Sequence, residues 1–257
     1  MKTKILYPFI GLTFLIFGYG NGQEVKKLTG PDVFPPVYGI VEVPETEGLH
    51  PSVLILHGAD GWSPAYATMA KAMSEAGYLA LTIDWFAGAK APLNETDLKR
   101  RFSFWPQYQE TVRNAVTFLR SHPSSKRQPV GIIGVSMGAH LAISVGNQIP
   151  GIYAVVDFFG AGGFGGSLES QVTNFPPLLI LHGEADTAVP VINAYDLQEA
   201  VIADGGEVEM YIYPNAHHAF IAPFLPDYSE SAANDAFMHA GLFLNKWLKG
   251  ADNGMGN

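Results

Sequence analysis

The chain has 257 residues, of which 47% are hydrophobic and 15% charged, a composition typical of a folded globular protein. Its 15 basic and 24 acidic residues give a formal net charge of −9, which argues against nucleic acid and anionic membrane surfaces as partners. The absence of cysteine from the sequence excludes disulfides, thiolate zinc sites and a cysteine nucleophile.

Residues 1–22 predict a signal peptide. Lys2 and Lys4 give a basic start, "ILYPFIGLTFLIFGYG" is a short apolar run, and "GNG" supplies small residues for cleavage. An uncleaved anchor is the alternative, but the apolar run is short for a membrane span. We therefore expect a secreted or periplasmic protein without stable membrane insertion, in which 23–250 form one domain and 251–257 a flexible tail.

Apolar segments with strand and helix character alternate along the rest of the chain. Strands are predicted at 37–44, 52–58, 78–86, 130–135, 153–159, 177–183 and 207–214, and helices at 66–77, 106–122, 137–149, 192–205 and 230–250. This alternation predicts an α/β fold with a mostly parallel central sheet of about eight strands and helices on both faces. The sequence does not decide the structure of segment 87–105, which is either a lid or a loop with a short helix over one edge of the sheet.

Ligands of such sheets bind beyond the carboxyl ends of the strands, and Ser136 follows the predicted strand 130–135. It lies in "GVSMG" and directly precedes a helix. Gly134 and Gly138 occupy the two positions at which side chains would clash in a tight strand-to-helix turn. This context indicates a nucleophile elbow; the alternative is a serine that caps the helix.

A nucleophile elbow requires an acid and then a histidine later in the chain. "LLILHGEADTAVP" supplies Asp186 after a buried strand, with Glu184 as the competitor. Asp186 is favoured because it stands farther beyond the strand end. "MYIYPNAHHAF" supplies the base, and from chemistry alone His217 and His218 are nearly equal candidates.

The developing oxyanion requires two backbone donors, one from the residue after the nucleophile and one from the loop after an earlier strand. Met137 and, within "LHGADGW", Ala59 are the candidates. Three aromatic residues near predicted strand ends are candidates for the substrate pocket: Trp62, Trp85 and Phe220. No spacing indicates a metal site or a phosphate loop, so neither metal nor cofactor is predicted.

"LHGADG", "GVSMGA", "DFFGAGG", "LLILHGEADTAVP" and "YPNAHHAF" together resemble the dienelactone hydrolase family over about 35–250. The resemblance implies an α/β-hydrolase fold without a large cap domain. It places the base on His218, two residues before a phenylalanine. It also implies Asp186 as the acid, with Ala59 and Met137 as oxyanion donors.

The sequence departs from the best-known members in two ways, since Ser136 replaces their cysteine and "HGADG" lacks their glutamate. The resulting expectation is a serine carboxylesterase acting on a small-molecule ester through an acyl-enzyme. A lactone, thioester or peptide as substrate, or an inactive binding protein of the same fold, are the alternatives. The oligomeric state is left open.

Overall fold

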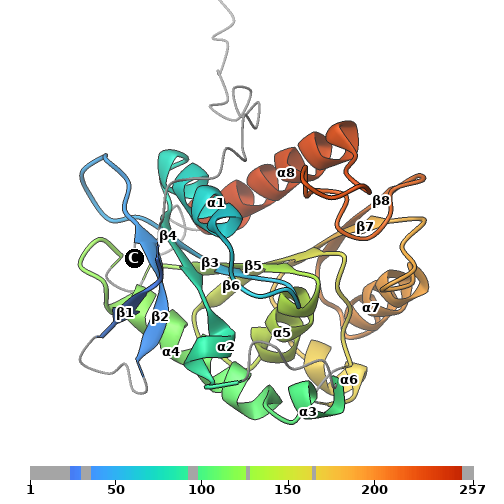
Figure 1. Ribbon diagram of the computed structural model, residues 1–257, viewed down its shortest axis with the longest axis horizontal. Coiled ribbons are helices and arrows are strands. Elements are labelled where there is room, and N and C mark those ends of the chain that lie inside the picture. The colour runs from blue at the N-terminus through green and yellow to red at the C-terminus, as the bar shows by residue number, and fades with distance from the viewer. Residues whose placement is uncertain (1–23, 30–35, 92–97, 126–127, 164–165, 251–257) are drawn as a thin grey trace, which may run out of the picture.

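An eight-stranded sheet forms the centre of the protein in a computed structural model that describes residues 24–29, 36–91, 98–125, 128–163 and 166–250 (Figure 1). The strands are β1 (Lys26–Leu28), β2 (Val37–Glu42), β3 (Ser52–Leu56), β4 (Leu79–Ile83), β5 (Val130–Val135), β6 (Ile152–Phe158), β7 (Leu178–Gly183) and β8 (Val208–Tyr213). The predicted signal peptide and tail lie outside the described residues and stay predictions.

The strand order is β1-β2-β4-β3-β5-β6-β7-β8. Neighbouring strands are parallel along the run β4-β3-β5-β6-β7-β8, whereas β2 is antiparallel to both of its neighbours, β4 and β1. Strands β3, β4, β5 and β7 are buried along their whole length, which explains why their sequences read as continuous apolar runs. The predicted mostly parallel sheet is confirmed.

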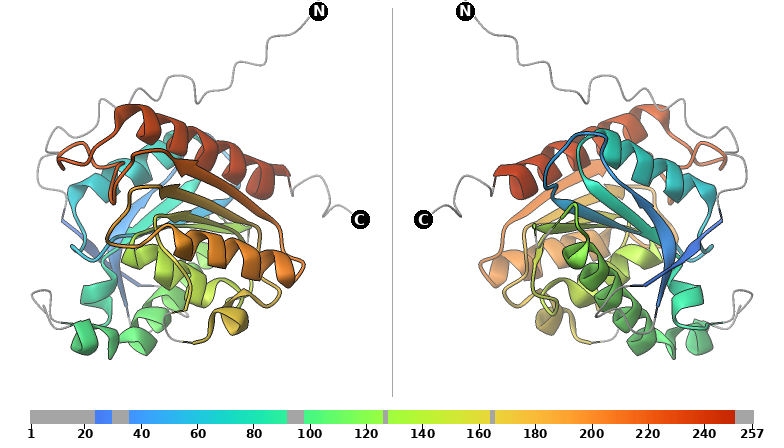
Figure 2. Two further views of the ribbon diagram at one scale, coloured as in Figure 1. Left: turned by 90° about the vertical axis from the view of Figure 1, so that its right-hand side faces the viewer. Right: turned by 90° about the vertical axis from the view of Figure 1, so that its left-hand side faces the viewer.

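Helices cover both faces of this sheet. They are α1 (Pro64–Glu75), α2 (Trp85–Gly88), α3 (Leu98–Phe102), α4 (Trp105–Ser121), α5 (Met137–Gly146), α6 (Leu168–Val172), α7 (Ile192–Ala203) and α8 (Glu230–Leu244). In Figures 1 and 2, α1 and α8 lie over one face, and α4, α5 and α7 lie over the other. Each face buries its own apolar core.

Two predicted elements need correction, and one strand was missed. The strand predicted at 78–86 ends at Ile83, because the Asp84 carboxylate accepts the Ala87 amide at 2.9 Å and begins the short helix α2. Strand β1 was not predicted. The helix predicted at 230–250 is α-helical only to Leu244 and continues as a π-helical turn.

The described parts of segment 87–105 include the end of α2 and all of α3, and they add no cap domain over the sheet. Residues 92–97, within the segment that was left open, lie outside the described residues. No helix in the described ranges is both long and apolar enough to span a bilayer.

Candidate active site

Ser136 sits in a sharp turn between β5 and α5, with φ of +51° and ψ of −117°. A positive φ is strained for a residue other than glycine and persists only where the surroundings enforce it. The flanking glycines allow the close backbone packing that holds this turn. A Cβ on Gly134 would lie 2.4 Å from Ala139 Cα, and one on Gly138 would lie 2.4 Å from the Leu56 carbonyl oxygen.

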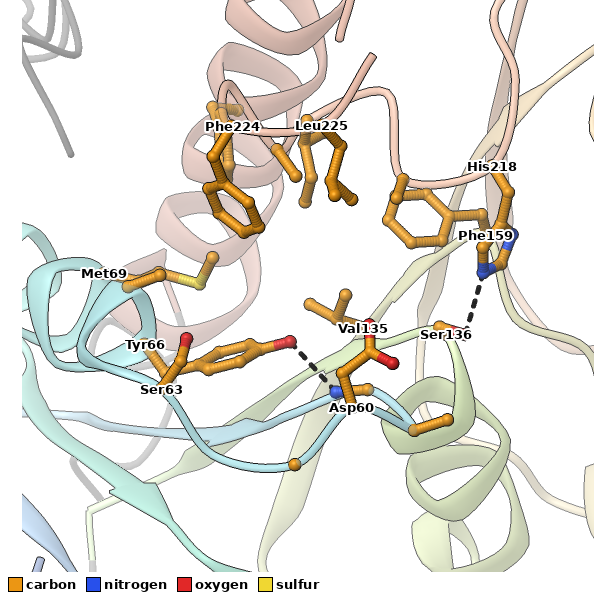
Figure 3. A pocket seen from close by; sticks show the side chains of 18 residues that line it. Asp60, Ser63, Tyr66, Met69, Val135, Ser136, Phe159, His218, Phe224 and Leu225 are labelled. Carbon is orange, nitrogen blue, oxygen red and sulfur yellow. Dashed lines mark hydrogen bonds between the residues drawn. The ribbon is translucent and has the colours of Figure 1, made fainter. Parts of the chain in front are cut away.

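An unbroken hydrogen-bonded chain starts at this serine. Ser136 Oγ lies 2.9 Å from His218 Nε2 (Figure 3), and His218 Nδ1 lies 2.7 Å from Asp186 Oδ2. The three residues follow β5, β8 and β7, at the same edge of the sheet. The structure thus brings together the serine, carboxylate and histidine that the sequence singled out, while Glu184 and His217 are exposed.

Asp186 is held by more than the histidine. Its Oδ1 accepts the amides of Ala188 and Val189, both at 2.8 Å, and its side chain is fully buried. Burial raises the pKa of Asp186, but the hydrogen bonds from His218 and the two amides outweigh burial, and the net pKa is lowered. A buried carboxylate in this state fixes the imidazole tautomer and stabilises an imidazolium.

A histidine packs behind this carboxylate. His182 Nε2 lies 2.8 Å from the Val189 carbonyl oxygen and 3.5 Å from Asp186 Oδ2. Its side chain is fully buried, and burial lowers its pKa. A neutral His182 therefore ties strand β7 to the loop that carries Asp186.

The two candidate oxyanion donors both have a backbone N–H available for a ligand. Met137 is the first residue of α5, and an amide at a helix N-terminus has no partner within its helix. Ala59 belongs to the loop after β3, and its carbonyl accepts Arg101 Nη1 at 3.0 Å. Within the described part of the chain, neither the Ala59 nor the Met137 amide N–H has a hydrogen-bond partner, so both are free to donate to a ligand.

A cavity of about 340 Å³ opens beside Ser136, His218 and Ala59. Its lining is largely apolar and comes from the loop after β3, the start of α1, the ends of β5 and β6, and the loop after β8. The principal apolar members are Met69, Val135, Phe159, Ile221, Phe224 and Leu225. Asp60 and the hydroxyl of Tyr66 add polar groups (Figure 3).

None of the three predicted pocket aromatics lines this cavity. Trp85 and Phe220 are fully buried: Trp85 stacks on the His57 ring with centroids 4.6 Å apart, and Phe220 packs against Phe159. Trp62 lies outside the lining as well. Trp85 and Phe220 thus fill the core, which is the usual destination of large apolar side chains.

Sequence reasoning missed three polar residues of the lining, Asp60, Ser63 and Tyr66. Asp60 lies in "LHGADGW", which was read for the backbone donor Ala59 and for Trp62, and Tyr66 is the first residue of the helix predicted at 66–77. Tyr66 OH accepts the Gly58 amide at 2.9 Å, so the hydroxyl supports the loop that carries Ala59. A polar aromatic in the first turns of a helix, directly after a glycine-rich loop, was the available signal.

Two further titratable groups are buried behind the serine. Burial raises the pKa of Asp157 to about 7, although the Gly160 amide, which donates to it at 2.6 Å, lowers it. Burial lowers the pKa of His140 to about 4, and its Nδ1 accepts the Ala161 amide at 3.0 Å. Among the described residues, no cluster of three or more His, Cys, Asp or Glu side chains could hold a metal ion.

Known proteins share both sequence and fold with this chain. The model of the "Dienelactone hydrolase family" matches residues 37–248. A candidate carboxymethylenebutenolidase of Methylorubrum extorquens is 23% identical over 238 residues, which cover 87% of this chain and 79% of that protein. Acyl-coenzyme A thioesterase 1 of Mus musculus is 25% identical over 143 residues, which cover 55% of this chain and 32% of that protein.

The crystal structure of a candidate dienelactone hydrolase from Klebsiella pneumoniae superposes with a TM-score of 0.75 at 18% identity. The superposition covers 87% of this chain and 98% of the other. At 18% sequence identity, this structural similarity supports the fold and not a shared activity.

Proposed function

Because the chain belongs to the dienelactone hydrolase family and is a hydrolase acting on ester bonds, we propose that it cleaves carboxylic esters through an acyl-enzyme on Ser136. The Ser136 hydroxyl attacks the ester carbonyl carbon while His218 Nε2 takes its proton. Asp186 holds the proton on His218 Nδ1 and stabilises the imidazolium that forms. The amides of Ala59 and Met137 donate to the oxyanion.

The second half of the cycle reuses the same groups. The imidazolium of His218 protonates the departing alcohol, and the acyl group remains on Ser136. Water then attacks the acyl carbonyl with His218 as base, and the acid leaves with the serine restored. Neither half requires a metal or cofactor.

The observation that carries this proposal is the continuity of the chain from Ser136 Oγ to Asp186 Oδ2, with contacts of 2.9 and 2.7 Å across His218. Such distances are those required of a nucleophile, its base and the group that orients the base. A serine that only capped α5 would not require a histidine at its hydroxyl.

A fluorophosphonate probe and para-nitrophenyl butyrate test the proposal together. The wild type should be labelled and should hydrolyse the ester, whereas Ser136→Ala should do neither. Ser63→Ala is the matched control, because Ser63 lines the same cavity without a place in the hydrogen-bonded chain. Equal labelling of Ser136→Ala and wild type, or no hydrolysis by the wild type, would refute the assignment.

The choice of base has its own paired test. His218→Ala should lose at least about 10³-fold in kcat/KM, the scale expected when a member of such a triad is removed. His217→Ala should retain most activity, because His217 is exposed. The reverse result would move the base to His217.

Thioester cleavage is the second candidate function. It uses the same acyl-enzyme chemistry and is favoured by the match to an acyl-coenzyme A thioesterase over 143 residues. A butyryl thioester assayed beside the oxygen ester decides between the two by the ratio of their kcat/KM values.

Export to the periplasm or the exterior is also part of the proposal, on the layout of residues 1–22. Expression of the full chain followed by cell fractionation and N-terminal sequencing tests it. A mature chain that begins near Gln23 outside the cytoplasm is expected, and an intact Met1 in the cytoplasm would contradict it.

A further inference from the structure

Among the described residues that line the largely apolar cavity, Asp60 is the only Asp, Glu, Lys or Arg. We propose that the cavity selects esters without a carboxylate and that Asp60 is the residue that discriminates against anionic substrates. This inference rests on the proposed ester hydrolysis at Ser136. It names the substrate class of that site: neutral esters whose apolar group fills the cavity.

Asp60 is placed to act on whatever enters. It lies in the loop between β3 and α1, directly after the candidate oxyanion donor Ala59, and its side chain is exposed. Figure 3 shows its carboxylate directed into the cavity, between Tyr66 and Ser136. Across the described residues Asp60 forms no ion pair, so its negative charge is not neutralised by a neighbour.

The neighbouring hydroxyl responds to this charge. Burial raises the pKa of Tyr66 to about 12, the hydrogen bond with Gly58 opposes that rise, and the negative charge of Asp60 adds to it. Tyr66 therefore stays a neutral hydroxyl, and the charge of Asp60 acts on a group that lines the cavity.

No cation offsets Asp60 inside the cavity. Within the described chain the lining contains neither lysine nor arginine. Arg101 is the cation beside the loop, but its guanidinium donates to the Ala59 carbonyl and lies 5.5 Å from the centroid of the Phe86 ring. Phe86 is not a lining residue. A substrate carboxylate would thus lose water and gain no counterion, which is unfavourable.

The rest of the lining suits hydrocarbon. Met69, Ile221 and Leu225 face the space from α1 and from the loop after β8, and Phe224, at 64% exposure, stands at its rim. A volume of about 340 Å³ is at the lower end of the range of about 300–1,000 Å³ that ligand sites occupy. A short or medium apolar acyl or alcohol group fits these limits.

A matched pair of substrates tests the inference. Methyl para-nitrophenyl adipate is neutral, and mono-para-nitrophenyl adipate differs from it by one free carboxylate. Both are assayed at low ionic strength, with subtraction of their spontaneous rates. For the wild type we expect kcat/KM for the neutral ester to exceed that for the anion by about tenfold or more, the scale of like-charge repulsion at a partly solvated site.

Asp60→Asn keeps the size of the side chain and removes its charge. It should raise the ratio of kcat/KM for the anionic ester to kcat/KM for the neutral ester about fivefold to tenfold. Asp196→Asn is the control for overall charge, because Asp196 is exposed on α7, away from the cavity; its ratio should match the wild type.

The outcomes separate this inference from the proposed function. Equal hydrolysis of both esters by the wild type, or an unchanged ratio in Asp60→Asn, would overturn the role of Asp60 and leave ester hydrolysis standing. No hydrolysis of either ester by the wild type would refute the proposed function itself. A tenfold preference that disappears in Asp60→Asn alone supports the inference.

Discussion

Replacing Gly138 by alanine should damage both the fold and the reaction, although the same change usually stabilises a helix. Gly138 lies in the first turn of α5, and alanine is favoured over glycine inside helices by about 1 kcal/mol. Here the added Cβ would lie 2.4 Å from the Leu56 carbonyl oxygen and 2.5 Å from that of His57. An ordinary C···O contact is about 3.3 Å or longer.

Both close contacts of the added Cβ are with backbone atoms at the end of β3, so a change of side-chain rotamer cannot relieve them. Relief requires α5 and the end of β3 to separate by about 1 Å, and overpacking of this kind costs about 1–3 kcal/mol. The net effect on the free energy of unfolding is then a loss of up to about 2 kcal/mol, after the gain in helix propensity. That loss corresponds to a fall in Tm of several degrees.

The catalytic loss should be larger than the loss of stability. Separation of α5 from β3 pulls Ser136 and Met137 away from the loop that carries Ala59. A misplacement of about 1 Å at a reacting centre can cost about 10²-fold in rate. We therefore expect kcat/KM for para-nitrophenyl butyrate to fall about 10²-fold at a temperature well below the Tm.

Gly250→Ala is the control, because a Cβ there meets nothing within 4 Å; its Tm and kcat/KM should match the wild type. The assay pairs thermal unfolding with steady-state kinetics on the same preparations. If Gly138→Ala kept kcat/KM within threefold of the wild type and an equal or higher Tm, the tight contact between α5 and β3 would not be what positions the serine.

Three further changes probe other parts of the site. Tyr66→Phe leaves the buried Gly58 amide without the acceptor it has at 2.9 Å, and kcat/KM measured with the neutral ester should fall about tenfold. Asp157→Asn should stabilise the protein at pH 8 but not at pH 4. The pKa of Asp157 is about 7 in the folded protein and 3.8 ordinarily, so the folded wild type binds more protons than the unfolded chain between these pH values. Its free energy of unfolding therefore falls as the pH rises from about 4 to 7, by at most about 4 kcal/mol. Urea unfolding at the two pH values measures this difference, and a constant difference would contradict it. Ala222→Trp narrows the lining, so kcat/KM for para-nitrophenyl hexanoate should fall at least about tenfold more than that for the acetate; a uniform loss would place the apolar group of the substrate elsewhere.

Most of the sheet could be predicted from the sequence because its inner strands are buried on both faces and read as uninterrupted apolar runs. Strand β1 could not, since it has three residues, two of them exposed lysines, and its pairing with β2 alone makes it a strand. Helix α2 was read as strand because Trp85 and Phe86 favour strands locally. The cap from Asp84 decides otherwise.

The hydrogen-bonded chain could be predicted for a different reason. Its three members each follow a strand, and parallel strands bring their carboxyl ends to one edge, so order along the sequence implied proximity in space. The cavity could not be predicted in this way. Its lining joins 58–69 to 218–225, and which aromatic residues face it depends on how α1 and the loop after β8 pack. Phe220 turns into the core, whereas Phe224, four residues later, stays at 64% exposure.

The two aspartates Asp186 and Asp60 have opposite roles because their surroundings differ. Asp186 is buried, and two amides and the imidazole donate to its oxygens, so its charge is balanced within the protein and acts on the histidine. Asp60 is exposed beside the cavity and unpaired among the described residues, so its field acts on the substrate. An unscreened carboxylate in contact with the oxyanion would oppose the negative charge that develops on that oxygen. Solvent at Asp60 and the free amides of Ala59 and Met137 reduce that opposition, which leaves discrimination between neutral and anionic esters as the effect of Asp60 that kinetics should detect.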